Sequence, residues 1–189
     1  MESEDRPWPR HPILAYFLTF TTYGTWRHGD DRGSVQRGSP GLLAACAELR
    51  TFERDEMDQP PYVMDALQAG KSFCTLRDVA DYRGWSLLAA HVRSNHLHAV
   101  VHANTTPERV MNDFKAYLSR RLNEARLDTP DRKRWTRHGS TQYLWSDAEV
   151  IACIRYTVHE QGEPMAVFVA ESYAEVSAPH RPDREGGRG

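Results

Sequence analysis

The chain has 189 residues, which is enough for one full domain with a hydrophobic core and too few for two ordinary domains. Hydrophobic residues make up 40% and charged residues 26% of the sequence, as in ordinary soluble globular proteins. No apolar run approaches the roughly 18 residues that a membrane span needs, so we expect no membrane partner. The net charge of −2 counts mildly against a nucleic-acid enzyme, because such proteins usually carry a basic surface.

The N-terminus and the cysteines bear on the cellular compartment. The N-terminus is acidic and broken by prolines, so it does not resemble a signal peptide. Cys46, Cys74 and Cys153 are far apart and form no CxxC pair, which indicates reduced thiols in the cytoplasm. We expect three parts: a flexible N-terminus at 1–12, one domain at 13–170 and a disordered tail at 171–189.

The first half of the chain predicts one strand and three helices, each ended by glycine or proline. The strand covers residues 13–23, which are β-branched and aromatic. The glycine-rich, charged segment after it predicts a loop. The helices are predicted at 41–57, 62–69 and 75–82.

The second half contains the clearest pattern, two apolar runs separated by a polar turn, which predicts a β-hairpin. A capping-box pattern, Ser146 with Glu149, marks the start of a later helix. The predicted elements are strands at 85–92 and 96–103, a helix at 107–127, a loop at 128–143, a helix at 146–161 and a strand at 165–169. Few strands and several helices around an antiparallel hairpin predict an α+β fold, with helices covering one face of the sheet.

Two histidines begin the second hairpin strand. His96 and His98 are two residues apart, so they project from the same face, about 6.6 Å apart along the strand, and one cation could lie between them. The spacing alone is a weak signal, because two partly exposed histidines that bond to neighbours give the same pattern. Their position directly after a polar turn favours a binding site, since such sites often lie in loops and at strand ends.

A tyrosine lies on the polar side of the helix predicted at 146–161. The aliphatic residues of that helix fall within an arc of about 100°, and Tyr156 falls nearly opposite them. Packing against another element is one interpretation of Tyr156. The other is nucleophilic attack on a phosphate, which forms a covalent phosphotyrosine. Glu160, one turn further on, could serve as a third metal ligand beside the histidines, with Gln161 as the alternative.

Basic residues are concentrated between positions 109 and 138, where nine Lys and Arg face four Asp and Glu. A solvated surface explains such a run as well as a nucleic-acid contact does. The candidates for DNA contacts are Arg120, Arg121, Arg137 and His138, with Ser140 and Thr141 beside them. The candidates for stacking on unpaired bases are Trp26, Trp135 and Trp145, although core or loop packing is the alternative for each.

The segment Ser94–Val101 resembles the His-hydrophobic-His strand of the IS200/IS605-like transposases with a single catalytic tyrosine, including their REP-associated relatives. Ile154–Val158 lies at about the distance at which that family carries its tyrosine, and residues 18–24 are similar to its first strand. The resemblance covers residues 13–170 and identifies them as an IS200-like transposase domain. Only the histidine pair is a sharp motif.

The resemblance implies a ferredoxin-like antiparallel sheet, a divalent metal (Mg²⁺ or Mn²⁺) and single-stranded DNA substrates with hairpins. It implies that His96 and His98 are metal ligands and that Tyr156 cleaves DNA, leaving a 5′-phosphotyrosine and a free 3′-hydroxyl. Glu160 carries over as a ligand only by position, because family members have an amide there. A homodimer is left open, since related enzymes often exchange the tyrosine helix between subunits.

The sequence departs from the family pattern in two places. Arg93-Ser94 replaces the Met-Pro that commonly precedes the Asn-His pair, and the usual Asn-Pro after the tyrosine helix is absent. Two other functions therefore stay open. One is a non-catalytic module that binds single-stranded nucleic acid, and the other is a metal-dependent nuclease in which an activated water replaces the tyrosine.

Overall fold

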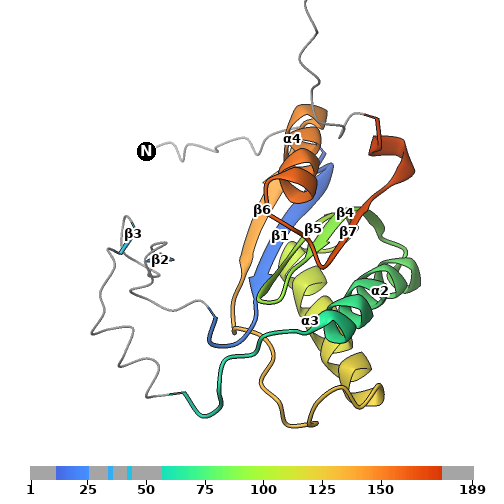
Figure 1. Cartoon of the computed structure of the whole chain (residues 1–189). Helices are drawn as coiled ribbons and strands as arrows, with labels where there is room; N and C mark the ends of the chain where they lie inside the picture. The colour runs from blue at the N-terminus through green and yellow to red at the C-terminus, as the bar shows by residue number, and fades with distance from the viewer. Residues whose placement is uncertain (1–11, 26–33, 36–41, 44–56, 176–189) are drawn as a thin grey trace, which may run out of the picture.

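A five-stranded antiparallel sheet carries helices on both of its faces (Figure 1). The computed structural model describes residues 12–25, 34–35, 42–43 and 57–175. The elements in chain order are β1 (Ala15–Thr21), β2 (Ser34–Val35), β3 (Leu42–Leu43), α2 (Ala66–Arg83), β4 (Ser86–Val92), β5 (His96–His102), α3 (Pro107–Glu124), β6 (Ser140–Leu144), α4 (Asp147–His159), β7 (Ala166–Val169) and a 3₁₀ turn (Glu171–Tyr173).

The order of the strands in the large sheet is β6-β1-β5-β4-β7. All neighbouring strands in it are antiparallel. The elements β1, α2, β4, β5, α3 and β6 form the β-α-β-β-α-β arrangement of a ferredoxin-like fold. The α+β class and the antiparallel ferredoxin-like sheet predicted from the sequence are thereby confirmed. Helix α4 and strand β7 extend this arrangement, while β2 and β3 pair separately.

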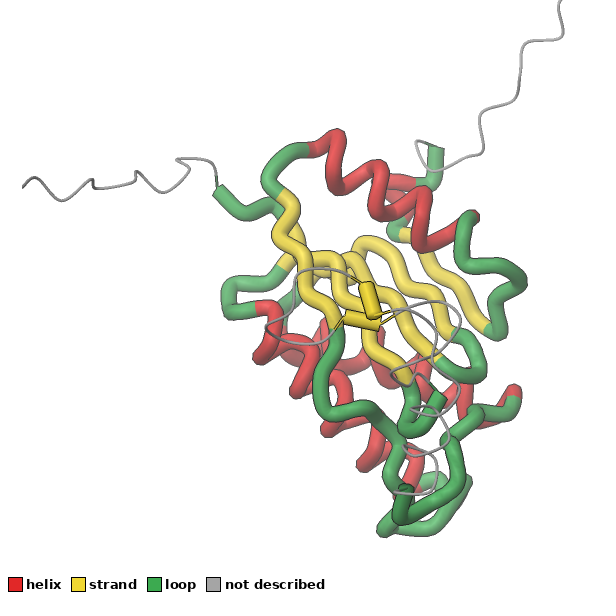
Figure 2. Tube along the Cα trace, turned by 90° about the vertical axis from the view of Figure 1, so that its left-hand side faces the viewer, coloured by secondary structure: helices red, strands yellow, loops and turns green. Residues whose placement is uncertain are grey.

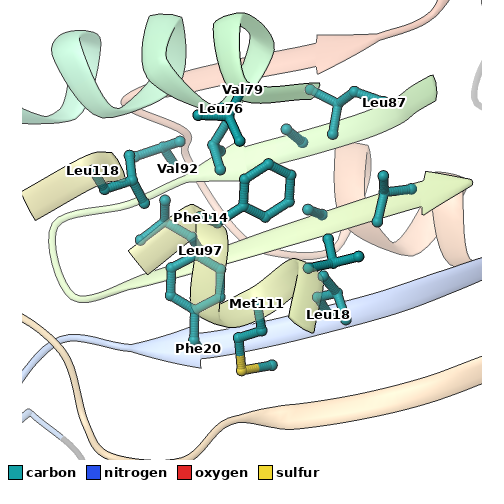
Figure 3. Packing of buried hydrophobic residues seen from close by; sticks show 14 of the residues in the cluster. Leu18, Phe20, Leu76, Val79, Leu87, Val92, Leu97, Met111, Phe114 and Leu118 are labelled. Atoms are coloured by element: carbon teal, nitrogen blue, oxygen red, sulfur yellow. The ribbon is translucent and has the colours of Figure 1, made fainter. Parts of the chain in front are cut away.

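The two faces of the sheet are covered by different helices (Figure 2). Helices α2 and α3 share one face, where they bury the larger hydrophobic cluster of the described chain, centred on Phe114 (Figure 3). Helix α4 packs on the opposite face over a smaller cluster that includes Val100 and Leu144. The expectation that helices share one face therefore holds for α2 and α3, and α4 adds a cover on the other.

Strand β5 shows how the sequence assigns residues to the two faces. Successive side chains of a strand point to opposite sides of the sheet. Leu97, Ala99 and Val101 are fully buried in the cluster beneath α2 and α3. The alternate positions His98 and Val100 face α4. The face that carries the histidine pair is therefore the face that carries the tyrosine helix.

The two helices predicted at 62–69 and 75–82 are a single helix, α2. It begins one turn later than predicted, at an Asp65 N-cap whose capping box is closed by Gln68. Gly70 does not end it, because a single glycine inside a helix costs only about 1 kcal/mol relative to alanine. The buried side chains of Leu76 and Val79 outweigh that cost.

The last residues of the loop predicted at 128–143 belong instead to strand β6, Ser140–Leu144. The sequence does not predict this strand because it is mostly polar. This strand lies at an edge of the sheet, and only Leu144 in it is buried. Of the helix predicted at 41–57, residues 44–56 lie outside the described residues, and Leu42–Leu43 form β3. The predicted flexible terminus and most of the predicted tail, at 1–11 and 176–189, lie outside them too. None of the described helices combines the length and apolarity needed to span a membrane.

Candidate active site

The two histidines lie at the start of β5 with their rings in contact. The ring centroids of His96 and His98 are 5.0 Å apart, and the rings meet edge to face. In the β1–β5 pairing, His98 is opposite Thr19 and His96 is opposite Thr21. The sheet therefore presents both imidazoles side by side on the face toward α4, as the sequence predicts.

Hydrogen bonds orient both imidazole rings. Nδ1 of His96 donates to Oδ1 of Asn95 over 2.8 Å, and Nδ1 of His98 shares a 2.8 Å hydrogen bond with the hydroxyl of Thr19. A histidine that donates through Nδ1 carries its lone pair on Nε2, which is the form that binds metals. The pair therefore fits a metal ligated through Nε2 of His96, and through Nε2 of His98 in the tautomer whose Nδ1 donates to Thr19.

His98 is held neutral by its surroundings. It is 5% exposed, and its ring stacks on Phe17 with centroids 5.5 Å apart. Burial, together with the nearby His96 and His91, lowers the pKa of His98 to about 3, although a hydrogen bond with the Gln161 side chain acts in the opposite direction. A neutral imidazole is the state that a metal ligand requires.

Tyr156 lies beside this histidine in the same chain. Its ring centroid is 6.0 Å from that of His98 and 5.9 Å from that of Phe17, and both contacts are edge-on. The side chain remains 41% exposed, so a substrate can reach it. Tyr156 belongs to the last turns of α4, which lie over the histidine end of the sheet. The side chain of Ile154, on the other side of the helix, is buried in the cluster beneath α4.

The two candidates for a third metal ligand differ in position. Glu160 is the exposed C-cap residue of α4, and the described part of the chain contains no group of three or more His, Cys, Asp or Glu side chains that could hold a metal. The structure therefore does not bring Glu160 to the histidine pair. Gln161 is half-buried, and its side chain makes the hydrogen bond to His98 and donates through Nε2 to the Tyr156 carbonyl over 3.3 Å.

The four candidate DNA contacts separate into two pairs. Arg120 lies over the Tyr117 ring and Arg121 forms an ion pair with Glu124, both on α3, across the sheet from the histidines. Arg137 and His138 are exposed in the segment before β6. That segment lies at the histidine end of the sheet, because the preceding Thr136 donates its backbone N–H to the Thr21 carbonyl, and Thr21 is opposite His96.

The tryptophans are used for packing where the structure describes them. The indole N–H of Trp135 donates to the Lys115 carbonyl, and its ring packs on Phe20. Trp145 stacks on Tyr143 with centroids 5.8 Å apart. Trp26 lies outside the described residues.

Sequence patterns alone do not indicate that Thr19, His91 or Arg93 belong to this region. Thr19 could be assigned to the face away from the core by its alternation with the buried Leu18 and Phe20. Its pairing with His98 depends on the register between strands 79 residues apart in sequence, which no local pattern specifies.

Comparison with known proteins bears on this geometry. Residues 70–150 match the family model described as "Transposase IS200 like". This segment is similar to the IS200-like transposases. The resemblance recognised in the sequence is thereby confirmed for the segment that carries β4, β5, α3 and β6, including both histidines. The matched segment ends before Tyr156, so the role of this tyrosine is supported only by the geometry described above.

Two solved transposase structures are similar to the chain at low identity. One is a REP-associated tyrosine transposase bound to a REP hairpin, with 11% identity and a TM-score of 0.43 over 82% of this chain and 70% of the other. The second, from Deinococcus radiodurans R1, is a candidate transposase with 17% identity and a TM-score of 0.44 over 82% of this chain and 95% of the other. No curated protein matches the chain significantly.

Proposed function

We propose that this chain is an IS200-like transposase, which cleaves and rejoins single-stranded DNA with Tyr156 as the nucleophile. The observation that supports this most is the 6.0 Å approach of the Tyr156 ring to His98 within one chain. A tyrosine used only for packing has no need to be 41% exposed beside a pair of oriented imidazoles. The proposed site needs no residue from a second subunit.

The proposed reaction exchanges one phosphoester bond for another. The Tyr156 oxygen attacks a backbone phosphorus, the bond from phosphorus to the 3′-oxygen breaks, and a 5′-phosphotyrosine forms. The phenolic proton is lost as the departing 3′-oxygen gains one, so the products are the adduct and a 3′-hydroxyl. In the reverse direction a 3′-hydroxyl attacks the phosphotyrosine, which joins strands and restores the tyrosine.

Three side chains would hold a divalent metal such as Mg²⁺ or Mn²⁺: His96, His98 and Gln161. When bound, the metal would neutralise charge on the phosphate oxygens. Asn95 and Thr19 orient the two imidazoles by hydrogen bonds to Nδ1. We favour the amide oxygen of Gln161 over Glu160 as the third ligand, because the Gln161 side chain is hydrogen-bonded to His98, whereas Glu160 completes no metal-binding group with the histidines among the described residues.

The DNA partner is proposed from the family match and from the surface at this end of the sheet. The REP-associated transposase noted above is bound to a REP hairpin, and we propose a single-stranded substrate with hairpins here as well. Arg137 and His138 would contact phosphates near the reacting strand. Arg120 and Arg121 lie across the sheet and would contact a more distant part of the DNA.

The test is adduct formation. The full-length protein is incubated with Mn²⁺ and a randomised pool of end-labelled hairpin DNAs with single-stranded flanks, and then separated on a denaturing gel. We expect a band shifted by the mass of the protein, formed by the wild type and abolished in Tyr156→Phe. Tyr82→Phe, an exposed tyrosine on α2, serves as the matched control and retains the band.

The other two functions predict different gels. Cleavage without a shifted band would identify a nuclease that uses an activated water. Retention of the DNA on a native gel with neither cleavage nor adduct would identify a non-catalytic binding module. Either result contradicts the role proposed for Tyr156.

A further inference from the structure

A third histidine lies beneath the tyrosine helix. His91 of β4 is fully buried and is directly opposite His98 in the β4–β5 pairing. Its Nδ1 donates to the backbone carbonyl of Thr157 over 2.8 Å. Thr157 immediately follows Tyr156 and lies in the last turn of α4, where helix carbonyls run out of backbone donors. His91 therefore ties the helix to the sheet at the residue beside the proposed nucleophile.

Arg93 makes a second tie from the end of the same strand. Its guanidinium donates to the backbone carbonyl of Gln161. Gly162 allows this close approach, since its φ is +71° and a Cβ atom there would lie 2.5 Å from the Arg93 guanidinium. Arg93 stands at one of the two places where the sequence departs from the family pattern, and Gln161 stands at the other.

We propose that His91 and Arg93 are positioning residues, whose hydrogen bonds to the Thr157 and Gln161 carbonyls hold Tyr156 against the histidine pair. The two bonds lie on either side of the C-cap of α4, so together they fix both the height and the rotation of its last turn. The proposal rests on the proposed function for its effect on rate. The tie itself does not depend on catalysis.

The burial of His91 argues against a role as a simple filler of the core. Its Nε2 is buried with no hydrogen-bond partner among the described residues. An aliphatic residue would fill the same space between sheet and helix without that unsatisfied atom, as Ala89 does two positions earlier on the same face. The hydrogen bond through Nδ1 is what the imidazole provides and an aliphatic side chain does not.

These two hydrogen bonds affect the proposed reaction because its rate depends on the exact position of the nucleophile. A displacement of about 1 Å at a reacting group can slow a reaction by about a hundredfold. Loss of the His91 donor frees the last turn of α4, and Tyr156 moves with it. The expected signature is a slower chemical step with unchanged binding of DNA and metal.

The test measures the single-turnover rate of adduct formation for three variants of the full-length protein. In His91→Leu the donor is lost, in His91→Asn an amide N–H replaces Nδ1–H, and in Arg93→Met the second tie is lost. We expect His91→Leu and Arg93→Met to slow the adduct step about 10- to 100-fold, and His91→Asn to recover most of the rate. The affinities of the two His91 variants for Mn²⁺ and for the hairpin DNA pool should stay within about twofold of wild type.

Amide hydrogen exchange of α4 separates this proposal from the proposed function. We expect exchange in the last turn of α4 to be at least about tenfold faster in His91→Leu, with α3 unchanged. If the wild type forms no adduct and α4 still loosens, the proposed function fails and the positioning role stands. If α4 exchange is unchanged, the positioning role is wrong.

The control is His102→Leu, because Nδ1 of His102 also contacts a backbone carbonyl, that of Leu14, but at the far end of β5. It should leave both the rate and the exchange of α4 unchanged. A parallel loss of rate and Mn²⁺ affinity in His91→Leu would overturn the proposal, since His91 would then act by orienting His98. Equal rates for His91→Leu and His91→Asn would overturn it as well.

Discussion

The two faces of the sheet bury different kinds of side chain. The face beneath α2 and α3 is a large cluster of aliphatic and aromatic residues centred on Phe114. The face beneath α4 has a smaller apolar cluster, which includes Val100 and Leu144. Toward the end of the helix this face also carries His91 and His98, which are nearly or fully buried together with Thr157 of α4.

The face beneath α2 and α3 therefore contributes mainly to stability, and the face beneath α4 holds the candidate active site. Apolar burial contributes about 25 cal/mol per Å², and the face beneath α2 and α3 supplies most of it. Buried polar groups cost free energy unless each has a partner, so the α4 face sacrifices some stability to hold imidazoles in fixed orientations. Substitutions on the two faces should therefore have distinct effects, and four experiments test this.

The largest effect should come from removing the metal or one of its ligands. We expect EDTA to abolish adduct formation by the wild type, and His98→Ala to abolish it even in excess Mn²⁺, because both remove the ligation proposed for the reacting phosphate. Thermal unfolding should show that His98→Ala still folds. His102→Ala, on the same strand at an exposed position, is the control. Undiminished adduct formation in EDTA would contradict the metal site.

The next effect concerns stability on the α2/α3 face. Phe114 is fully buried, and Phe114→Ala should lower the free energy of unfolding by about 3–5 kcal/mol in urea titrations. The adduct rate per folded molecule should not change, because the cavity lies away from α4. Ile154→Ala, fully buried beneath α4, should lower both stability and rate. Equal rates for the two variants would show that the faces are not functionally separate.

A smaller effect is expected from the threonine that orients His98. Thr19→Val removes the hydroxyl bonded to Nδ1, and loss of such a partner typically weakens metal affinity or activity about 10- to 100-fold. Thr21→Val is matched in strand and face, but its hydroxyl bonds to Thr136. Isothermal titration with Mn²⁺ should separate the two variants. The same loss in both would indicate a general disturbance of β1.

The smallest effect concerns the segment that carries Arg137 and His138. Lys115 donates to the Thr136 and His138 carbonyls, and burial lowers the pKa of its ammonium to about 8 from an ordinary 10.5. The unfolded chain therefore binds the Lys115 proton more tightly than the folded chain does. Burying the charged ammonium destabilises the folded state in full below pH 8, and this destabilisation decreases as the pH rises toward 10. Urea midpoints at pH 7.5 and 9.5 should show wild type gaining stability relative to Lys115→Met. A constant difference between the two proteins would contradict the lowered pKa.

Local patterns in the sequence were enough to predict the hairpin and the tyrosine helix. The alternation around Arg93-Ser94-Asn95 predicts β4 and β5 within one residue, and the Ser146–Glu149 capping box predicts the first turn of α4. The polar strand β6 was missed, because an edge strand with one buried residue has no apolar run. Gly70 predicts a helix end because the free-energy cost of a glycine in a helix is local, while the packing that offsets this cost comes from other elements.

The site was predictable only in part for the same reason. His96 and His98 share a face by strand parity alone. The partners of His98 and His91, by contrast, come from strands and helices 79 and 66 residues away, so only the fold brings them together. The choice between Glu160 and Gln161 depends on how the chain leaves α4, which a helical wheel does not describe.

The strands that precede and follow α4 in the chain, β6 and β7, are the two outer strands of the sheet. Strand β6 leads into the helix from one margin, and β7 continues from it at the other, paired with β4. Helix α4 is therefore joined at each of its ends to an outer strand of the sheet. If α4 stays attached through both strands, the cycle of cleavage and rejoining that we propose exchanges the DNA ends at a stationary tyrosine.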